Sequence, residues 1–186
     1  MNMDMRYFVA AGVALLTILI VLAVVYYRRA YKASRSSWQE LLDRLILINR
    51  EGVKKIAMDT IDVHGNRRDD EHARELDADE IWQLIGGLEG VETLQHNSRV
   101  LVDVAAYLHT WYPEASAIAE ELRLSAREIA WHVSSLQDGA KAGNLGAWFR
   151  AYAQNAAATY YLMTRQLLSL CENGDKRLLT DLQRVL

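Results

Sequence analysis

Residues 147–170 have the sequence AWFRAYAQNAAATYYLMTRQLLSL, and this stretch decides the expected fold. Its apolar side chains recur at intervals of three and four residues: Phe149, Tyr152, Ala153, Ala156, Tyr160, Met163 and Leu167. This spacing is typical of an α-helix with one broad buried face. The stretch therefore predicts a long helix, and so wide an apolar face needs other helices to cover it.

The sequence on both sides of this stretch also has helical periodicity. Ser37 and Glu40 have the spacing of a capping box, which begins a helix that Gly52 is expected to end. Further helices are predicted at residues 53–63, 77–85, 91–112, 113–124, 125–136 and 176–186. No strand is needed to account for the pattern. We therefore predict an all-α bundle of about six or seven helices, forming one domain over residues 37–186.

The N-terminal region contains a run of 21 residues, 7–27, without a charged side chain. As a helix this run is about 31 Å long, close to the thickness of the hydrocarbon core of a bilayer. Aromatic side chains, which favour membrane interfaces, lie at both ends of the run: Tyr7, Phe8, Tyr26 and Tyr27. We predict a transmembrane helix here, preceded by a short extracytoplasmic tail at residues 1–6.

A cleaved signal peptide is the alternative interpretation of this run. It requires a basic segment before a shorter apolar run, and small residues at a cleavage site after it. Here Asp4 offsets Arg6 before the run, and basic side chains follow it: Arg28, Arg29, Lys32 and Arg35. This pattern favours a retained membrane anchor.

The same basic side chains predict the orientation of the anchor. By the positive-inside rule, the basic juxtamembrane linker at residues 28–36 lies in the cytoplasm, together with residues 37–186. We therefore expect a single-pass protein of the cell (inner) membrane with its N-terminus outside, and the lipid bilayer as one of its partners.

Residues 116–136, SAIAEELRLSAREIAWHVSSL, resemble the helix-turn-helix of bacterial repressors. In this resemblance the pair Leu124 and Ser125 forms the turn, and the following helix is the recognition helix. It implies that Arg127, Trp131 and Ser134 face a DNA groove. Acidic side chains outnumber basic ones around this segment, which disfavours nucleic acid as a partner. A membrane-tethered DNA-binding regulator is therefore the alternative function.

Two pairs of side chains have a spacing that places a carboxylate and an imidazole on one helix face. They are Glu92 with His96 and Glu128 with His132. Di-iron bundles use Glu-x-x-His with two further glutamates, which is a different spacing. We interpret both pairs as helix-surface ion pairs and predict no metal site.

The sequence also lacks the common catalytic and cofactor motifs. We find no G-x-S-x-G, no phosphate-binding P-loop, no dinucleotide fingerprint and no H-E-x-x-H. The single cysteine, Cys171, lies near the expected C-terminus of a helix, where the helix dipole disfavours a thiolate. We therefore predict no catalytic residue, no cofactor and no small-molecule substrate.

Large aromatic side chains are the best candidates for a contact surface, because Trp and Tyr dominate protein interfaces. The candidates are Trp131, Trp148, Tyr160 and Tyr161. Tyr160 and Tyr161 are adjacent and cannot both point into the core of one helix. The sequence thus predicts a membrane-anchored adaptor, or an accessory subunit of a membrane complex, that binds a protein partner or a second copy of itself.

Overall fold

The computed structural model describes residues 12–21, 24, 37–62, 64–66, 68, 75–113, 115–172 and 176–186. The chain divides into two compact units, Met1–Ser36 and Ser37–Leu186.

In the first unit, residues 12–21 are helical. The large apolar side chains of this helix are all more than half exposed: Val13, Leu15, Leu16, Ile18, Leu19, Ile20 and Val21. The Thr17 hydroxyl donates a hydrogen bond to the Val13 carbonyl at 2.8 Å, so the helix satisfies its own polar side chain.

The predicted membrane span extends beyond what the structure describes. No helix among the described residues has the length and apolar character needed to cross a membrane. The aromatic and basic side chains that flank the predicted span lie outside the described residues: Tyr7, Phe8, Tyr26, Tyr27, Arg28, Arg29, Lys32 and Arg35.

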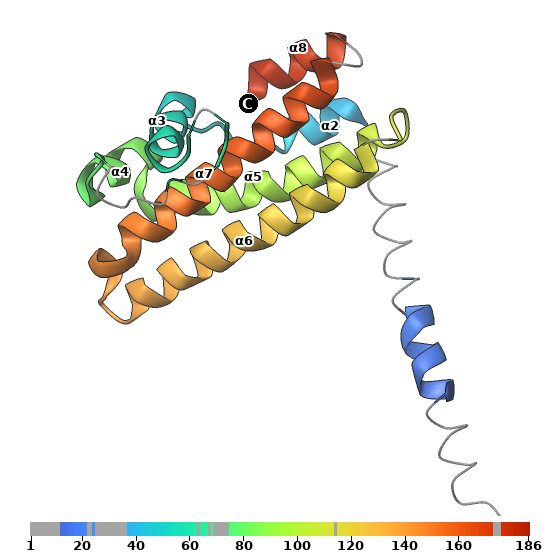
Figure 1. Cartoon of the computed structure of the whole chain (residues 1–186), viewed down its shortest axis with the longest axis horizontal. Helices are drawn as coiled ribbons and strands as arrows, with labels where there is room; N and C mark the ends of the chain where they lie inside the picture. Colours follow the sequence, from blue (N-terminus) through green and yellow to red (C-terminus); the bar gives the residue numbers. More distant parts are fainter. Residues whose placement is uncertain are drawn as a thin grey trace, which may run out of the picture. The chain divides into compact units, whose positions relative to one another are not determined.

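Every helix or strand that the structure describes in the second unit is an α-helix, which confirms the all-α prediction. Figure 1 shows its helices, which are α2 (Trp38–Asp43), α3 (Arg50–Thr60), α4 (Ala78–Ile85), α5 (Gly87–Leu108), α6 (Ala115–Lys141), α7 (Leu145–Glu172) and α8 (Lys176–Val185). The three longest, α5, α6 and α7, pack side by side, and the shorter helices pack around them.

The core lies where α5, α6 and α7 meet. Its largest fully buried side chains on these helices are Leu94, Leu101, Leu108, Leu122, Ile129, Leu136, Tyr160 and Met163. The predicted helix over residues 147–170 is therefore confirmed as α7, and its apolar face is the one that α5 and α6 cover.

Several predicted helix ends are confirmed by their capping contacts. The Ser37 amide donates to Glu40 Oε2 at 2.8 Å, and the Ser37 hydroxyl accepts from the Glu40 amide, which together form the capping box of α2. Asp77 caps the N-terminus of α4 by accepting from the Glu80 amide at 2.8 Å. Gly86 ends α4 with a φ of 84°, a left-handed conformation that glycine adopts at low cost.

The prediction that Gly52 ends a helix is wrong. The first helix of the domain ends at Asp43, and Asn49 caps a new helix by accepting from the Gly52 amide at 3.0 Å. Gly52 lies in the first turn of α3, where a Cβ would lie only 2.4 Å from the Leu84 carbonyl oxygen. A glycine is required here because α3 and α4 approach closely.

The predicted helix-turn-helix is also wrong. α6 is one continuous helix of 27 residues, and both Leu124 and Ser125 lie within it. The buried side chains on either side of the expected turn form one helical stripe: Ala115, Ala119, Leu122, Ile129, Val133 and Leu136. A single helix buries all of them against α5 and α7, so no break is favoured.

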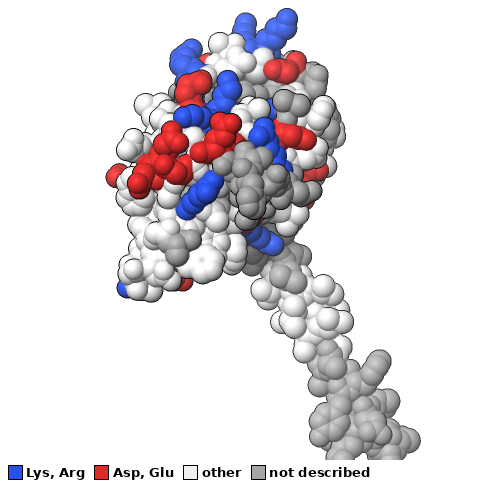
Figure 2. Space-filling model, turned by 60° about the vertical axis from the view of Figure 1, so that its left-hand side comes forward, with Lys and Arg blue, Asp and Glu red and all other residues white. Residues whose placement is uncertain are grey.

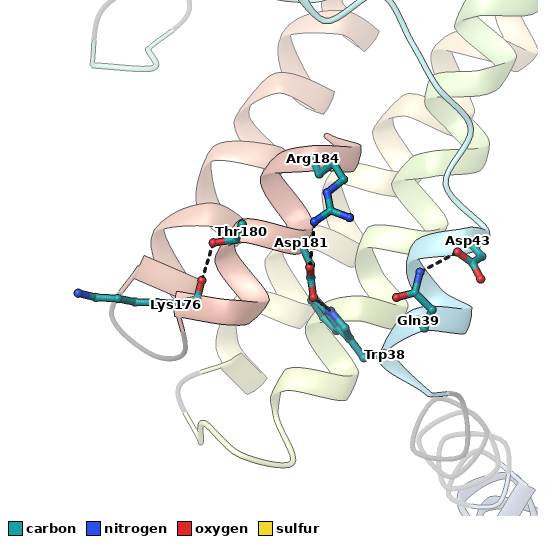
Figure 3. A network of polar contacts seen from close by, with 7 residues as sticks. All are labelled: Trp38, Gln39, Asp43, Lys176, Thr180, Asp181 and Arg184. Atoms are coloured by element: carbon teal, nitrogen blue, oxygen red, sulfur yellow. Dashed lines mark hydrogen bonds and ion pairs between the residues drawn. The ribbon is translucent and has the colours of Figure 1, made fainter.

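The C-terminal helix α8 is fixed to the N-terminal side of the domain by polar contacts (Figure 3). Trp38 Nε1 donates to Asp181 Oδ2 at 3.3 Å, and Asp181 Oδ1 lies 3.9 Å from the Arg184 guanidinium. Arg50 donates to the Gln183 carbonyl at 2.9 Å and to the Arg184 carbonyl, which satisfies acceptors at the C-terminus of α8. α8 therefore connects α2 and α3 to α7.

Candidate interaction surface

Three aromatic side chains from α6 and α7 form a cluster on the surface, which we call the aromatic face: Trp131, Trp148 and Tyr152. The side chains of Trp131 and Trp148 are 58% and 51% exposed. The Tyr152 ring contacts both, with centroids 5.4 Å from Trp131 at a near-perpendicular angle and 6.1 Å from Trp148. The aromatic face therefore joins two helices and presents two large rings to solvent.

The packing of α6 and α7 explains why these rings point outward. On α6, Ile129 and Val133 are buried, so Trp131 between them lies on the opposite side of the helix. On α7, Phe149 is 2% exposed and its ring lies 4.7 Å from that of Trp82. Trp148, one residue earlier, is turned by about 100° from Phe149 and faces solvent.

His132 lies beneath the aromatic face and is 4% exposed. Its ring centroid is 5.0 Å from that of Trp131 and 5.6 Å from that of Tyr152. His132 Nε2 lies 3.6 Å from Glu128 Oε1, the contact expected from their spacing, but the imidazole is buried and does not lie on the helix surface as predicted. The buried imidazole packs beneath the rings of Trp131 and Tyr152 and supports them.

The second carboxylate–imidazole pair makes contacts with other helices instead. Glu92 Oε1 accepts from Gln137 Nε2 of α6 at 2.7 Å, and His96 Nε2 lies 3.0 Å from the Arg44 carbonyl oxygen. Within the described part of the chain, no group of three or more His, Cys, Asp or Glu side chains is placed to hold a metal ion.

The aromatic face belongs to a part of the chain with little charge. Residues 129–149 contain one acidic and one basic side chain, Asp138 and Lys141, and these two pair at 3.3 Å. Leu124, which is 64% exposed, lies two helical turns before Trp131 on the same side of α6, with the exposed Arg127 between them. Figure 2 shows that charged side chains gather on one part of the visible face of the domain and leave another part largely uncharged.

The residues predicted to read DNA lie on the exposed side of α6. Arg127, Trp131 and Ser134 are all exposed, but they belong to one uninterrupted helix. Glu120 and Glu121 are exposed one to two turns before Arg127 on the same helix. Residues 116–136 therefore do not form the helix-turn-helix that the DNA-binding alternative requires.

The two adjacent tyrosines do not belong to the aromatic face. Tyr160 is 2% exposed, so of the two adjacent tyrosines it is not the one available for contact. Burial raises the pKa of Tyr160 to about 12, and the nearby Asn97 amide and Arg50 charge lower it only in part. Tyr161 is half-buried, and its ring lies 6.0 Å from the Arg165 guanidinium carbon. It lies nine residues after Tyr152, on the opposite side of α7.

Tyr152 packs against the core, as its place in the apolar stripe of α7 predicts, and it also contacts the two exposed tryptophans, which the sequence does not indicate. Leu124, on the same side of α6 as Trp131, is predicted by the sequence to lie in a turn. A signal for Leu124 exists, because it is out of phase with the stripe that contains Leu122 and Ile129.

Comparison of the chain with protein-family models, with curated proteins and with solved structures gives no match. We therefore infer function from the chemistry of the surface alone.

Proposed function

We propose that this chain is a non-catalytic, single-pass membrane protein whose cytoplasmic helical domain binds a protein partner through the aromatic face. It acts as an adaptor that tethers the partner to the membrane, or as an accessory subunit of a membrane complex. The observation that carries the proposal is the pair Trp131 and Trp148, both more than half exposed and both in contact with the Tyr152 ring.

Exposed tryptophans of this kind are favourable contact residues. Each ring buries a large apolar area when it is covered, at a gain of about 25 cal/mol per Å². The contacts with Tyr152 and the buried His132 restrict the rings before binding, so less side-chain entropy is lost. Residues of this type are the common hot spots of protein interfaces, and truncating one costs about 2 kcal/mol or more in binding.

The membrane part of the proposal is supported by the N-terminal sequence and by its described helix. The uncharged run at residues 7–27 has the length of a span. Residues 12–21 form a helix that exposes apolar side chains on all sides and bonds the Thr17 hydroxyl internally, which suits a lipid environment. The basic side chains after the run support a cytoplasmic domain.

The test is purification of the tagged full-length chain from its native membrane in mild detergent, followed by mass spectrometry of the proteins that copurify. We expect a stoichiometric partner with the wild-type chain. The double variant Trp131→Ala/Trp148→Ala is expected to lose it, because two hot spots are removed and affinity falls by about 30-fold or more for each.

Trp111→Ala is the matched control, because Trp111 is 66% exposed but lies between α5 and α6, away from the aromatic face. This variant is expected to keep the partner. The proposal is contradicted if the wild-type chain purifies alone, or if the double variant retains the partner while it unfolds at the same temperature as the wild type.

A further inference from the structure

The turn between α5 and α6 presents an exposed tryptophan that does not belong to the aromatic face. Trp111 is 66% exposed, while its neighbour Tyr112 packs against the core. The amides of both residues donate to the Leu108 carbonyl at 2.9 Å, so the backbone of the turn is fixed. The outward position of Trp111 is therefore set by a hydrogen-bonded turn.

The turn itself contains no formally charged side chain. Residues 104–113 contain no Asp, Glu, Lys or Arg, although Glu114 follows them. His109, Thr110 and Pro113 are exposed beside Trp111. An uncharged turn with one projecting indole has the composition of segments that lie at the interface between lipid headgroups and acyl chains, where Trp is enriched.

The turn lies at the end of the domain where the chain enters from its N-terminal side. Trp38, the first residue of α2, places its ring centroid 5.8 Å from that of Tyr107, four residues before Trp111. The aromatic face lies further along α6, since Trp131 follows Ala115 by 16 residues, or about 24 Å of helix. Between the aromatic face and the turn, the turn lies nearer the N-terminal entry point.

The length of the linker then limits how far this end can lie from the bilayer. If residues 7–27 span the membrane, nine residues, 28–36, connect the span to Ser37. Fully extended, they reach about 30 Å, and any compact conformation is shorter. The turn is thus held at a high effective concentration next to the lipid surface, so even a weak contact is populated.

We propose that the turn at residues 109–113 binds the lipid surface, with the Trp111 indole at the level of the headgroups. The contact rests on the proposed membrane anchor, and it fixes which end of the domain faces the bilayer. The aromatic face is left directed away from the lipid, where a cytoplasmic partner has access to it.

Tryptophan fluorescence tests this contact, because all five tryptophans lie in residues 37–186 and none lies in the predicted span. The full chain is reconstituted in vesicles of phosphatidylcholine and phosphatidylglycerol, with or without bromine on the acyl chains near the headgroups. Bromine quenches only indoles that it approaches closely. We expect quenching of about one fifth of the emission, the share of one tryptophan among five, and loss of this quenching in Trp111→Phe.

Trp131→Phe and Trp38→Phe are the controls, and each is expected to keep the quenched fraction. Quenching that disappears with either control instead of Trp111→Phe would overturn the contact. So would a chain that floats with the vesicles but shows no quenching, a result that leaves the anchor intact. A chain that does not float contradicts the anchor and the contact together.

Discussion

Both faces of α6 carry large apolar side chains, but the outer face also exposes Glu120, Glu121 and Arg127, and the two faces have different roles. The inner face contains Leu122, Ile129 and Leu136, each fully buried against α5 and α7. The outer face contains Leu124 and Trp131, which are 64% and 58% exposed. The presence of large apolar side chains therefore does not by itself distinguish the face that folds the domain from the face that remains available. The position of each side chain in the helical repeat makes this distinction.

The largest expected effect is on the inner face. Ile129→Ala removes a fully buried side chain and leaves a cavity, which should lower the free energy of unfolding by about 2–5 kcal/mol. Leu124→Ala, on the outer face, should change it by less than about 0.5 kcal/mol. Urea denaturation followed by circular dichroism measures both, and equal losses would show that the two faces are not distinct.

The comparison extends to α7 through the buried Tyr160. Its pKa is raised from 10.0 to about 12 because burial favours the neutral phenol. Ionisation of Tyr160 therefore does not affect the free energy of unfolding below pH 10. As the pH rises toward 12, the free energy of unfolding falls by up to about 3 kcal/mol. Tyr160→Phe should remove this loss.

The same variant should leave stability near neutral pH almost unchanged, because the polar contact of the Tyr160 hydroxyl with Asn97 is secondary to the hydrogen bonds that Asn97 makes with Ile46. Urea midpoints of both chains at pH 8 and pH 11 isolate the effect from the titration of other groups. Parallel pH profiles for the wild type and Tyr160→Phe would rule it out.

Helical phase also explains which parts of the structure were predictable from sequence. The long stripe of α7 and the caps at Ser37 and Asp77 are local signals, and the structure contains all three. The turn at Leu124 was mistaken because a Leu-Ser pair is a local signal too. The burial of Leu122 and Ile129 on one continuous stripe outweighs it, and that burial depends on α5 and α7.

The contact surface was only partly predictable for a related reason. Sequence indicates that Trp131 and Trp148 are large and amphipathic, but not that Tyr152 would join them across two helices. Tyr160 and Tyr161 are adjacent, so their side chains differ in direction by about 100° around the helix axis, and this difference decides which of them is buried. The broad apolar face of α7 does not settle that choice until the neighbouring helices are in place.

The next largest expected change in the free energy of unfolding comes from a buried polar contact between α3 and α7. Asp59 accepts from Gln154 Nε2 at 2.8 Å and from the Glu75 amide at 2.7 Å. Asp59→Ala leaves the buried Gln154 amide without this acceptor and should cost about 1–3 kcal/mol. Asp103→Ala, which removes an exposed pair with Arg44, should cost less than about 1 kcal/mol. A loss for Asp59→Ala no greater than that for Asp103→Ala would show that the buried contact is not structural.

The smallest expected effect on stability is on the aromatic face itself. Trp148 is 51% exposed and contacts Tyr152 at a ring distance of 6.1 Å, so Trp148→Ala should cost no more than about 1 kcal/mol. Trp82 is a matched control, since it is 42% exposed but packs 4.7 Å from the buried Phe149 ring and covers Gly87. Trp82→Ala should cost about 2 kcal/mol.

The two variants separate folding from binding when partner retention is measured beside stability. Trp148→Ala should keep the fold and lose the partner, because its ring contributes little to the core and much to the exposed surface. Trp82→Ala should weaken the fold and keep the partner below its unfolding temperature. A larger stability loss for Trp148→Ala than for Trp82→Ala would mean that the aromatic face belongs to the core of the domain, and its exposure would then no longer indicate a binding surface.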